Sequence, residues 1–198
     1  MNTRTPFALL LAAAAVAMST PTFAQRPPSP ASAQPEGFLC CNMRSDGKWI
    51  SDSNYADNGQ RVVPLGSPAK VTGYGRYRVH VTLDGTSQSI GNDYSREIPM
   101  EAFAKRYVVA DDPRVKLAAY PAKIREAVQA GRVTRGMTRE QVLMSLGYPI
   151  ASENPQLETA TWRYWQSSFA EYQVVFDNAG RVKEVVADPT LKRLVSDE

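Results

Sequence analysis

Alternation of apolar and polar residues is clearest between Arg76 and Leu83. The apolar positions are Tyr77, Val79, Val81 and Leu83, and Arg76, Arg78, His80 and Thr82 fall between them. Side chains of a strand point alternately to its two faces, so this segment is predicted to be a strand with one buried face. Asp84-Gly85 follows it as a turn signal. Glycines at 66, 73, 75, 85 and 91 supply further kinks, and the pattern as a whole predicts a small β module over residues 38–98.

Helical spacing of apolar residues begins after this module. Met100, Phe103, Ala104 and Tyr107 share one side of a predicted helix over 100–109, which ends before Pro113. Pro121 suits the first turn of a second helix, because a proline there loses no hydrogen bond. The apolar side of that second helix comprises Ile124, Ala127 and Val128, and Gly131 closes it.

The best-marked helix follows Thr138. Thr138-Arg139-Glu140-Gln141 fits a capping box, in which the Thr138 hydroxyl accepts from the Gln141 backbone and the Gln141 amide reaches back to the cap. Val142, Leu143 and Leu146 supply its apolar stripe. Gly147 suits the left-handed position that ends a helix, and Pro149 prevents continuation.

Three aromatic-rich strands are predicted between Trp162 and Val186. The face expected to pack on the helices comprises Trp162, Tyr164, Val174, Phe176, Val182 and Val186. The opposite face comprises Arg163, Trp165, Gln173, Val175, Lys183 and Val185. Asn178-Ala179-Gly180 predicts a tight hairpin, with glycine at the position that needs a positive φ. A mixed face with a central tryptophan is typical of a docking surface. The β module of the same chain could instead pack on this face, and that packing is the preferred interpretation.

Four segments of this C-terminal half resemble, in order, the BamE (SmpA/OmlA) domain. They are 136–142, 146–149, 162–165 and 175–182. The resemblance implies two helices packed on a three-stranded antiparallel sheet in a secreted envelope protein. The best-known member of that family is a small lipoprotein that assists the complex inserting β-barrels into the outer membrane. The resemblance therefore implies outer-membrane assembly machinery and other envelope proteins as partners.

A second resemblance concerns the N-terminal half. Residues 62–74, a glycine-punctuated segment that leads into an alternating strand, look like part of a bacterial SH3-like domain. The resemblance implies an alternative function, the binding of peptidoglycan or a peptide. The compact, polar and aromatic loop Gly91–Arg96 is a candidate binding loop, with Asn92, Tyr94 and Arg96 as contact residues. Asn-Asp after a glycine is more often turn chemistry alone, and that interpretation is preferred.

The N-terminus indicates export. Arg4 precedes an apolar run from Phe7 to Met18, and Thr22-Phe23-Ala24 is typical of a cleavage site, so residues 1–24 are predicted to be a signal peptide. The run is shorter than the roughly 20 residues that span a bilayer. Residues 25–37 are rich in proline, alanine and serine and predict a disordered tether. The predicted location is the periplasm, and association with the outer membrane is left open.

Composition excludes some functions. The formal net charge is +3, with no basic run, so nucleic acid is not a predicted partner, whereas anionic lipid and peptidoglycan remain candidates. His80 is the only histidine, and it lies between arginines on a predicted strand. No HExxH, GxSxG or P-loop pattern occurs. The sequence therefore predicts no enzyme, no catalytic residue, no cofactor and no metal site.

The two cysteines are neighbours, Cys40 and Cys41. Adjacent Cα atoms lie about 3.8 Å apart, below the usual range for a disulfide, which argues against a bond between them. A structural zinc site wants four ligands, and the chain offers these two cysteines and His80. Lipidation of Cys40, an intermolecular or mixed disulfide, and two half-buried thiols with a packing role remain open, and the last is preferred.

The predicted architecture is α+β. Its segments are a signal peptide (1–24), a tether (25–37), a small SH3-like β module (38–98), a connecting helix (99–119), a BamE-like domain (120–189) and a tail (190–198). The predicted function is that of an exported non-enzymatic scaffold or accessory factor in outer-membrane protein assembly or envelope integrity. The predicted partner-binding residues are Arg163, Trp165, Gln173, Val175, Lys183, Asn92, Tyr94 and Arg96.

Overall fold

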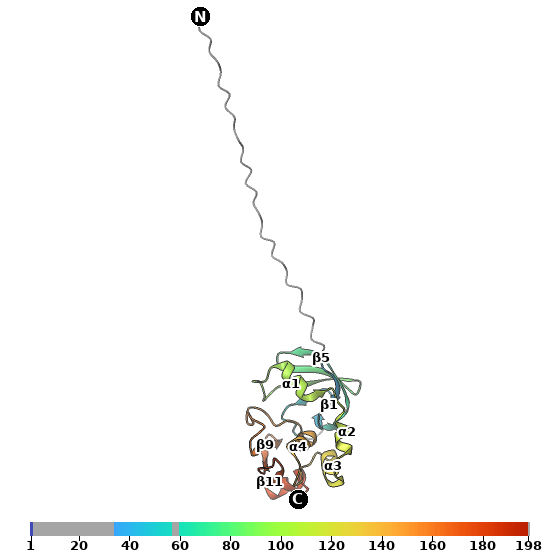
Figure 1. Ribbon diagram of the computed structural model, residues 1–198, viewed down its shortest axis with the longest axis vertical. Coiled ribbons are helices and arrows are strands. Elements are labelled where there is room, and N and C mark those ends of the chain that lie inside the picture. Colours follow the sequence, from blue (N-terminus) through green and yellow to red (C-terminus); the bar gives the residue numbers. More distant parts are fainter. Residues whose placement is uncertain (2–33, 57–59, 198) are drawn as a thin grey trace. The chain divides into compact units, whose positions relative to one another are not determined.

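The computed structural model describes Met1, residues 34–56 and residues 60–197. The predicted signal peptide and most of the predicted tether lie outside the described residues. The described chain is mixed α+β, which confirms the predicted class (Figure 1). Among the helices it contains, none is long and apolar enough to cross a membrane.

The N-terminal half is built on a six-stranded sheet. Its order is β3 (Trp49–Ser51), β7 (Thr86–Gly91), β6 (Arg78–Leu83), β5 (Pro68–Gly75), β1 (Glu36–Leu39) and β8 (Val108–Val109). The β3–β7 pair is parallel and the other pairs are antiparallel. A two-stranded sheet joins β2 (Met43–Ser45) to β4 (Arg61–Val63). The predicted strand is confirmed from Arg78 to Leu83, where Val79, Val81 and Leu83 are buried on one face of β6. Arg76 and Tyr77, also predicted to belong to the strand, lie in the turn before it.

Both borders of the predicted β module differ in the structure. Strand β1 begins inside the range assigned to the tether, where Glu36 pairs with Lys70 of β5. Helix α1 (Met100–Tyr107) buries Phe103 and Tyr107 in the same core as the sheet, and β8 then joins the sheet beside β1. The segment after the module therefore completes the core of the N-terminal half.

The C-terminal half has the predicted two helices on a three-stranded antiparallel sheet. Helices α3 (Ala122–Gln129) and α4 (Arg139–Leu146) share a hydrophobic core with the sheet β11–β10–β9 (Val182–Val186, Ala170–Phe176, Thr161–Ser167). Trp162 is fully buried, and its ring centroid lies 4.7 Å from that of Phe176. Two short helices that the pattern did not predict, α2 (Pro113–Ala118) and α5 (Pro189–Val195), each begin with an aspartate cap followed by proline.

The capped helix is confirmed in detail. The Gln141 backbone N–H donates to the Thr138 hydroxyl, and the Gln141 side chain accepts from the Thr138 N–H, so both halves of the capping box form. Gly147 ends α4 with φ of 80°, a conformation that favours glycine. The predicted hairpin is confirmed as well, with Gly180 at φ of 70°.

Strand β11 does not alternate as predicted. The register shifts between Val175 and Phe176, so that Phe176 pairs with Val182 whereas Val175 pairs with Glu184. A bulge places two residues opposite one and changes which face the following side chains occupy. Val185 is therefore buried at 2% exposure and Val186 is 48% exposed, so the predicted orientations of these two residues were wrong.

The N-terminal half contacts the helix pair through two buried asparagines. The Asn42 side-chain amide donates to the carbonyl oxygens of Val128 (2.6 Å) and Ser145 (3.3 Å). The Asn54 side-chain amide donates to the carbonyl oxygen of Leu146 (2.7 Å). Contact with the sheet occurs at its edge, where the Ala56 N–H donates to the carbonyl of Gln166 in β9.

Candidate functional site

The sheet face turned away from the helices, here called the outer face, carries the predicted residues Arg163, Trp165, Gln173, Val175 and Lys183. The cross-strand pairs Val175–Glu184 and Gln173–Val186 add Glu184 and Val186 to it. Of the predicted five, Arg163 and Lys183 are exposed, and the other three are half-buried. Trp165 and Val175, the two large apolar residues among the predicted five, belong to neither hydrophobic core. Among the described residues this face is thus partly open to solvent.

Glu153 organises the charged part of the outer face. Its carboxylate accepts from the Trp165 indole N–H at 2.9 Å and lies 3.9 Å from the Arg163 Nε. Glu171 lies 3.6 Å from the same Arg163 nitrogen. Arg163 thus has two acidic neighbours but stays partly open to solvent, where such ion pairs contribute little to stability.

Asn154 holds the backbone of Arg163 in place. Its side-chain oxygen accepts from the Arg163 N–H at 2.8 Å, and its amide donates to the carbonyls of Arg163 (3.1 Å) and Ile150 (3.0 Å). The side chain therefore mimics a paired strand at the edge of β9. Asn154 and Glu153, with Arg163, Gln173 and Thr161, line a shallow cleft of about 260 Å³.

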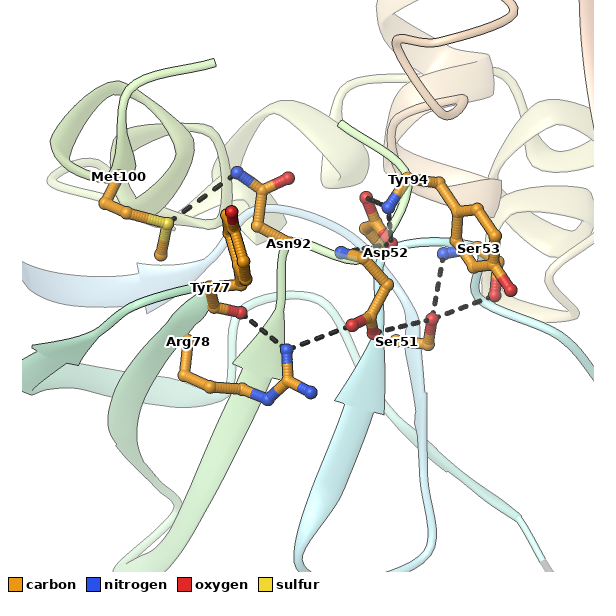
Figure 2. A network of polar contacts seen from close by, with 9 residues as sticks. Ser51, Asp52, Ser53, Tyr77, Arg78, Asn92, Tyr94 and Met100 are labelled. Carbon is orange, nitrogen blue, oxygen red and sulfur yellow. Dashed lines mark hydrogen bonds and ion pairs between the residues drawn. The ribbon is translucent and has the colours of Figure 1, made fainter. Parts of the chain in front are cut away.

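The second predicted site is the Gly91–Arg96 loop, which a buried carboxylate holds in place. Figure 2 shows Asp52 bonded to the backbone nitrogen of Tyr94, and its carboxylate also accepts from the Asp93 N–H. The Arg78 guanidinium donates to the Asp93 carboxylate at 2.9 Å and to the carbonyl of Tyr77. The same guanidinium lies 3.8 Å from the centre of the Trp49 ring.

Burial dominates the protonation of Asp52. The side chain is 1% exposed, and loss of solvation raises the pKa of its carboxyl to about 6. Hydrogen bonds from Ser95 and from the Tyr94 and Asp93 backbone act in the opposite direction but do not cancel this effect. The charge on Asp52 therefore depends on pH in the mildly acidic range.

The three loop residues predicted to bind a partner differ in accessibility. Asn92 is 1% exposed and its amide donates to the Ile98 carbonyl and the Met100 sulfur, so its side chain is not accessible to a partner in this structure. The residue supports the loop from inside. Tyr94 is 45% exposed, and the exposed Arg96 stacks its guanidinium 4.6 Å from the Tyr77 ring centre.

The structure joins the loop to the segment that holds the outer face. The Ser152 N–H donates to the carbonyl of Tyr94 (3.1 Å), and the Ala151 N–H donates to the Ser95 hydroxyl (3.0 Å). Residues 151–154 therefore contact the loop at one end and Arg163 and Trp165 at the other. Sequence inspection missed this connection, for which the only local signal is the pair of prolines, Pro149 and Pro155, that bracket the segment.

Sequence inspection also missed Phe169. This residue lies in the turn between β9 and β10 and is 97% exposed. A fully exposed phenylalanine at the end of this hairpin is an apolar group available to a partner. Its position at a turn, outside any alternating pattern, explains why the periodicity did not single it out.

The cysteines differ from all three interpretations that were left open. Cys40 and Cys41 are bonded to each other across a Cα separation of 3.8 Å, and the described residues include no free cysteine. Short Cα separation therefore did not exclude the bond, and the preference for free thiols was wrong. His80 is exposed on β6, where its Nδ1 lies 3.0 Å from the Ser89 hydroxyl. Over the described ranges, no group of three His, Cys, Asp or Glu residues could hold a metal.

The C-terminal fold and its open sheet face define a small α+β domain of the helix-pair-on-sheet type. Residues 123–185 match the family model described as the outer membrane protein assembly factor BamE domain. This span runs from α3 into β11, so the C-terminal half contains a BamE-like domain. The comparisons with curated proteins and with solved structures gave no match. The SH3-like resemblance of the N-terminal half is not confirmed by them.

Proposed function

We propose that this protein is an exported, non-enzymatic accessory factor that acts as a scaffold in outer-membrane protein assembly or envelope integrity. The match of residues 123–185 to the BamE domain is the observation that supports it most. The corresponding location is the periplasm, in association with the outer membrane. Envelope proteins, including the outer-membrane assembly machinery, are the proposed partners.

The outer face is the proposed docking surface. It combines a half-buried indole with the exposed cations Arg163 and Lys183, and Phe169 lies at its end. Tryptophan and arginine are the residues that most often dominate binding energy at protein interfaces. Tyr94 and Arg96 lie on the neighbouring loop and extend the same proposed surface.

Replacement of the central tryptophan tests this proposal. Trp165→Ala is expected to weaken binding to the purified β-barrel assembly complex by about 2 kcal/mol or more, which biolayer interferometry measures. The free energy of unfolding should fall by less than about 1 kcal/mol, because the ring is outside the core.

Leu194→Ala is the matched control for this experiment. Leu194 is 60% exposed on α5, outside the outer face, and its truncation should leave binding unchanged. Equal affinities for wild type and Trp165→Ala would remove the outer face as the docking surface. Failure of the wild type to bind the complex at all would contradict the proposed partner.

A second candidate function is the binding of peptidoglycan or a peptide by the β module. It is favoured by the contacts of the Tyr77 ring with the guanidinium groups of Arg76 (5.2 Å) and Arg96 (4.6 Å), and by the exposed Tyr94 two residues before Arg96 in the chain. Aromatic rings and guanidinium groups together suit a ligand with an apolar surface and anionic groups, which includes anionic lipid. Titration of muropeptides into wild type and Tyr94→Ala distinguishes this function from the first. Binding that Tyr94→Ala weakens would support it, whereas docking at the outer face requires no muropeptide binding.

A further inference from the structure

Three sulfur-bearing side chains lie together between β1 and the start of β2. The Cys41 Sγ lies 4.0 Å from the Met43 Sδ, and Cys40 is bonded to Cys41. Cys41 and Met43 are buried in the N-terminal core, at 1% and 0% exposure, whereas Cys40 is half-buried. A methionine thioether, like a cysteine thiolate, is a ligand for soft metal ions. These three sulfurs therefore form a donor set that a search for groups of His, Cys, Asp and Glu does not include.

The spacing of the Cys41 and Met43 sulfurs suits two ligands of one metal ion. Metal–sulfur bonds in proteins are about 2.3 Å long, as for zinc, and two such bonds at about 120° place their sulfur atoms about 4 Å apart. The Cys41 Sγ and the Met43 Sδ already have this separation. Cu(I) accepts three sulfur ligands in a plane, whereas a structural zinc ion takes four ligands. The donor set therefore favours Cu(I).

Backbone hydrogen bonds hold this segment without any help from the sulfur atoms. The Cys40 N–H donates to the carbonyl of Tyr107 (2.9 Å), and the Asn42 N–H donates to the carbonyl of Met144 (3.0 Å). Met43 lies in strand β2, which pairs with β4. Cleavage of the disulfide should therefore leave the backbone positions of all three donors unchanged.

A pocket of about 610 Å³ gives access to the cysteine pair. Cys40 and Cys41 both contribute to its lining. The lining also includes Val115, which is 73% exposed, so the pocket reaches the surface. Cys40 is the less buried of the two cysteines and has space to rotate within the pocket, while Cys41 stays beside Met43. A small reductant and a metal ion can therefore reach the sulfurs without unfolding the core.

We propose that reduction of the Cys40–Cys41 bond creates a binding site for one Cu(I) ion, with the Cys40 Sγ, the Cys41 Sγ and the Met43 Sδ as its ligands. A dithiol supplies two electrons and two protons: the S–S bond breaks, two S–H groups form, and the dithiol becomes a disulfide. Cu(I) then displaces both protons to solvent, and the thioether binds without losing one. Copper stays in the same oxidation state throughout.

The same bond also switches the site off, because the disulfide offers no thiolate to a metal. Metal binding at this position is thus tied to the redox state of the two cysteines. The inference goes beyond the proposed scaffold role and does not depend on it, since no residue of the outer face or of the Gly91–Arg96 loop is a ligand.

Transfer of Cu(I) from the coloured chelator bicinchoninate tests the site. The full chain is reduced with dithiothreitol, freed of it without air, and compared with the oxidised chain. The reduced chain should withdraw one Cu(I) per molecule, and the oxidised chain should withdraw none. X-ray absorption of the copper-loaded chain should show three sulfur neighbours. An excess of Zn(II) should leave the bound Cu(I) in place.

Two methionine variants separate the thioether from the general packing. Loss of an outer-shell partner alone lowers metal affinity about 10–100-fold, so Met43→Leu should weaken Cu(I) binding at least about tenfold. Met137→Leu is the matched control, because Met137 is equally buried but belongs to the C-terminal core. It should bind Cu(I) as wild type does. Leucine has nearly the volume of methionine, so both variants should fold, which thermal unfolding checks.

Four outcomes overturn the proposal. Equal Cu(I) uptake by the reduced and oxidised chains would show that the cysteines are not the ligands. Wild-type affinity in Met43→Leu would remove the thioether from the site. Displacement of Cu(I) by Zn(II) would contradict the choice of ion. Loss of the dispersed amide NMR spectrum on reduction would show that the donors do not stay together once the disulfide is broken.

Discussion

Asp52 shows how a single buried residue positions a candidate binding loop. Its carboxylate accepts hydrogen bonds from the backbone of Asp93 and Tyr94, and this bonding fixes the direction in which the Tyr94 ring leaves the loop. The Arg78–Asp93 ion pair and the stacking of Arg78 on Trp49 hold the adjacent turn. The loop that carries the exposed residues Tyr94 and Arg96 is thus held in place by a titratable group, the Asp52 carboxylate.

Replacement of Asp52 by asparagine should change how stability depends on pH. In the folded chain, burial raises the pKa of Asp52 to about 6 from 3.8. Between these values the folded state binds a proton that the unfolded state does not, so this residue's contribution to stability falls as pH rises. The total loss between about pH 4 and about pH 7 is of order 3 kcal/mol. Urea unfolding of wild type and Asp52→Asn over this range measures it as a difference between two curves.

The sign of that difference is the decisive result. Relative to Asp52→Asn, the wild type should lose stability steadily as pH rises, and both curves should run parallel above about pH 7. Other carboxylates titrate in both proteins and cancel in the comparison. Parallel curves throughout the range would mean that Asp52 is not protonated in the folded chain at mildly acidic pH.

At the scale of elements, Gly147 links the end of α4 to the N-terminal half. A Cβ on Gly147 would lie 3.1 Å from the Met43 sulfur and 3.3 Å from the Asn54 amide nitrogen. Gly136 has a similar positive φ of 88°, but a Cβ there would meet nothing within 4 Å. Substitution of Gly136 therefore tests backbone strain alone, whereas substitution of Gly147 tests backbone strain together with crowding by the added methyl group.

Alanine at these two glycines should have unequal costs. Gly136→Ala is expected to lower the free energy of unfolding by about 1–2 kcal/mol through the left-handed backbone alone. Gly147→Ala should lower it by at least about 1 kcal/mol more, because the added methyl group crowds Met43 and Asn54. Chemical denaturation of both variants checks this. Equal losses would show that the neighbours of Gly147 move aside freely.

Helix α4 could be predicted from sequence because its signals are local. The capping box, the apolar stripe and the terminal glycine occupy fewer than about a dozen consecutive positions, and each acts on backbone groups next to it. Strand β11 could not be predicted to the residue, because the bulge that buries Val185 arises from pairing with β10. Helix α5 was missed because only tertiary packing shows that Leu191 and Val195 join the C-terminal core.

The residues of the candidate site also divide into those that local sequence patterns predict and those that depend on the tertiary fold. Arg163 and Trp165 could be placed on one face by alternation alone. Glu153 and Asn154 could not, because their contacts join residues brought together by the fold of the segment between α4 and β9. The burial of Asn92 was also hidden, since turn residues have the same composition whether their side chains point outward or inward.

At the scale of the whole molecule, two hydrophobic cores are joined by buried polar groups. The N-terminal core centres on the six-stranded sheet and α1, and the C-terminal core centres on α3, α4 and the three-stranded sheet. Leu65, from the N-terminal half, packs in the C-terminal core, and its backbone N–H donates to the Asn42 side chain at 3.0 Å. Asn42 thus satisfies groups from both halves with one amide.

Replacement of Asn42 should therefore separate the unfolding of the two halves. Asn42→Ala leaves the Leu65 N–H and the carbonyls of Val128 and Ser145 without this partner, at a cost of about 1–3 kcal/mol for each buried group left unpaired. In the wild type, the amides of β6 and those of β10 should lose their protection from hydrogen exchange at the same urea concentration. In Asn42→Ala the two transitions should occur at different concentrations.

Asn154→Ala supplies the matched comparison, because Asn154 is also buried but bonds only within the C-terminal half, to Ile150 and Arg163. This variant should lose stability while β6 and β10 still unfold together, since its lost bonds do not cross between the halves. Separate transitions already present in the wild type would mean that the halves are independent and that Asn42 couples nothing. Coincident transitions in Asn42→Ala would mean that Asn54 and the packing of Leu65 are sufficient to keep the two cores cooperative.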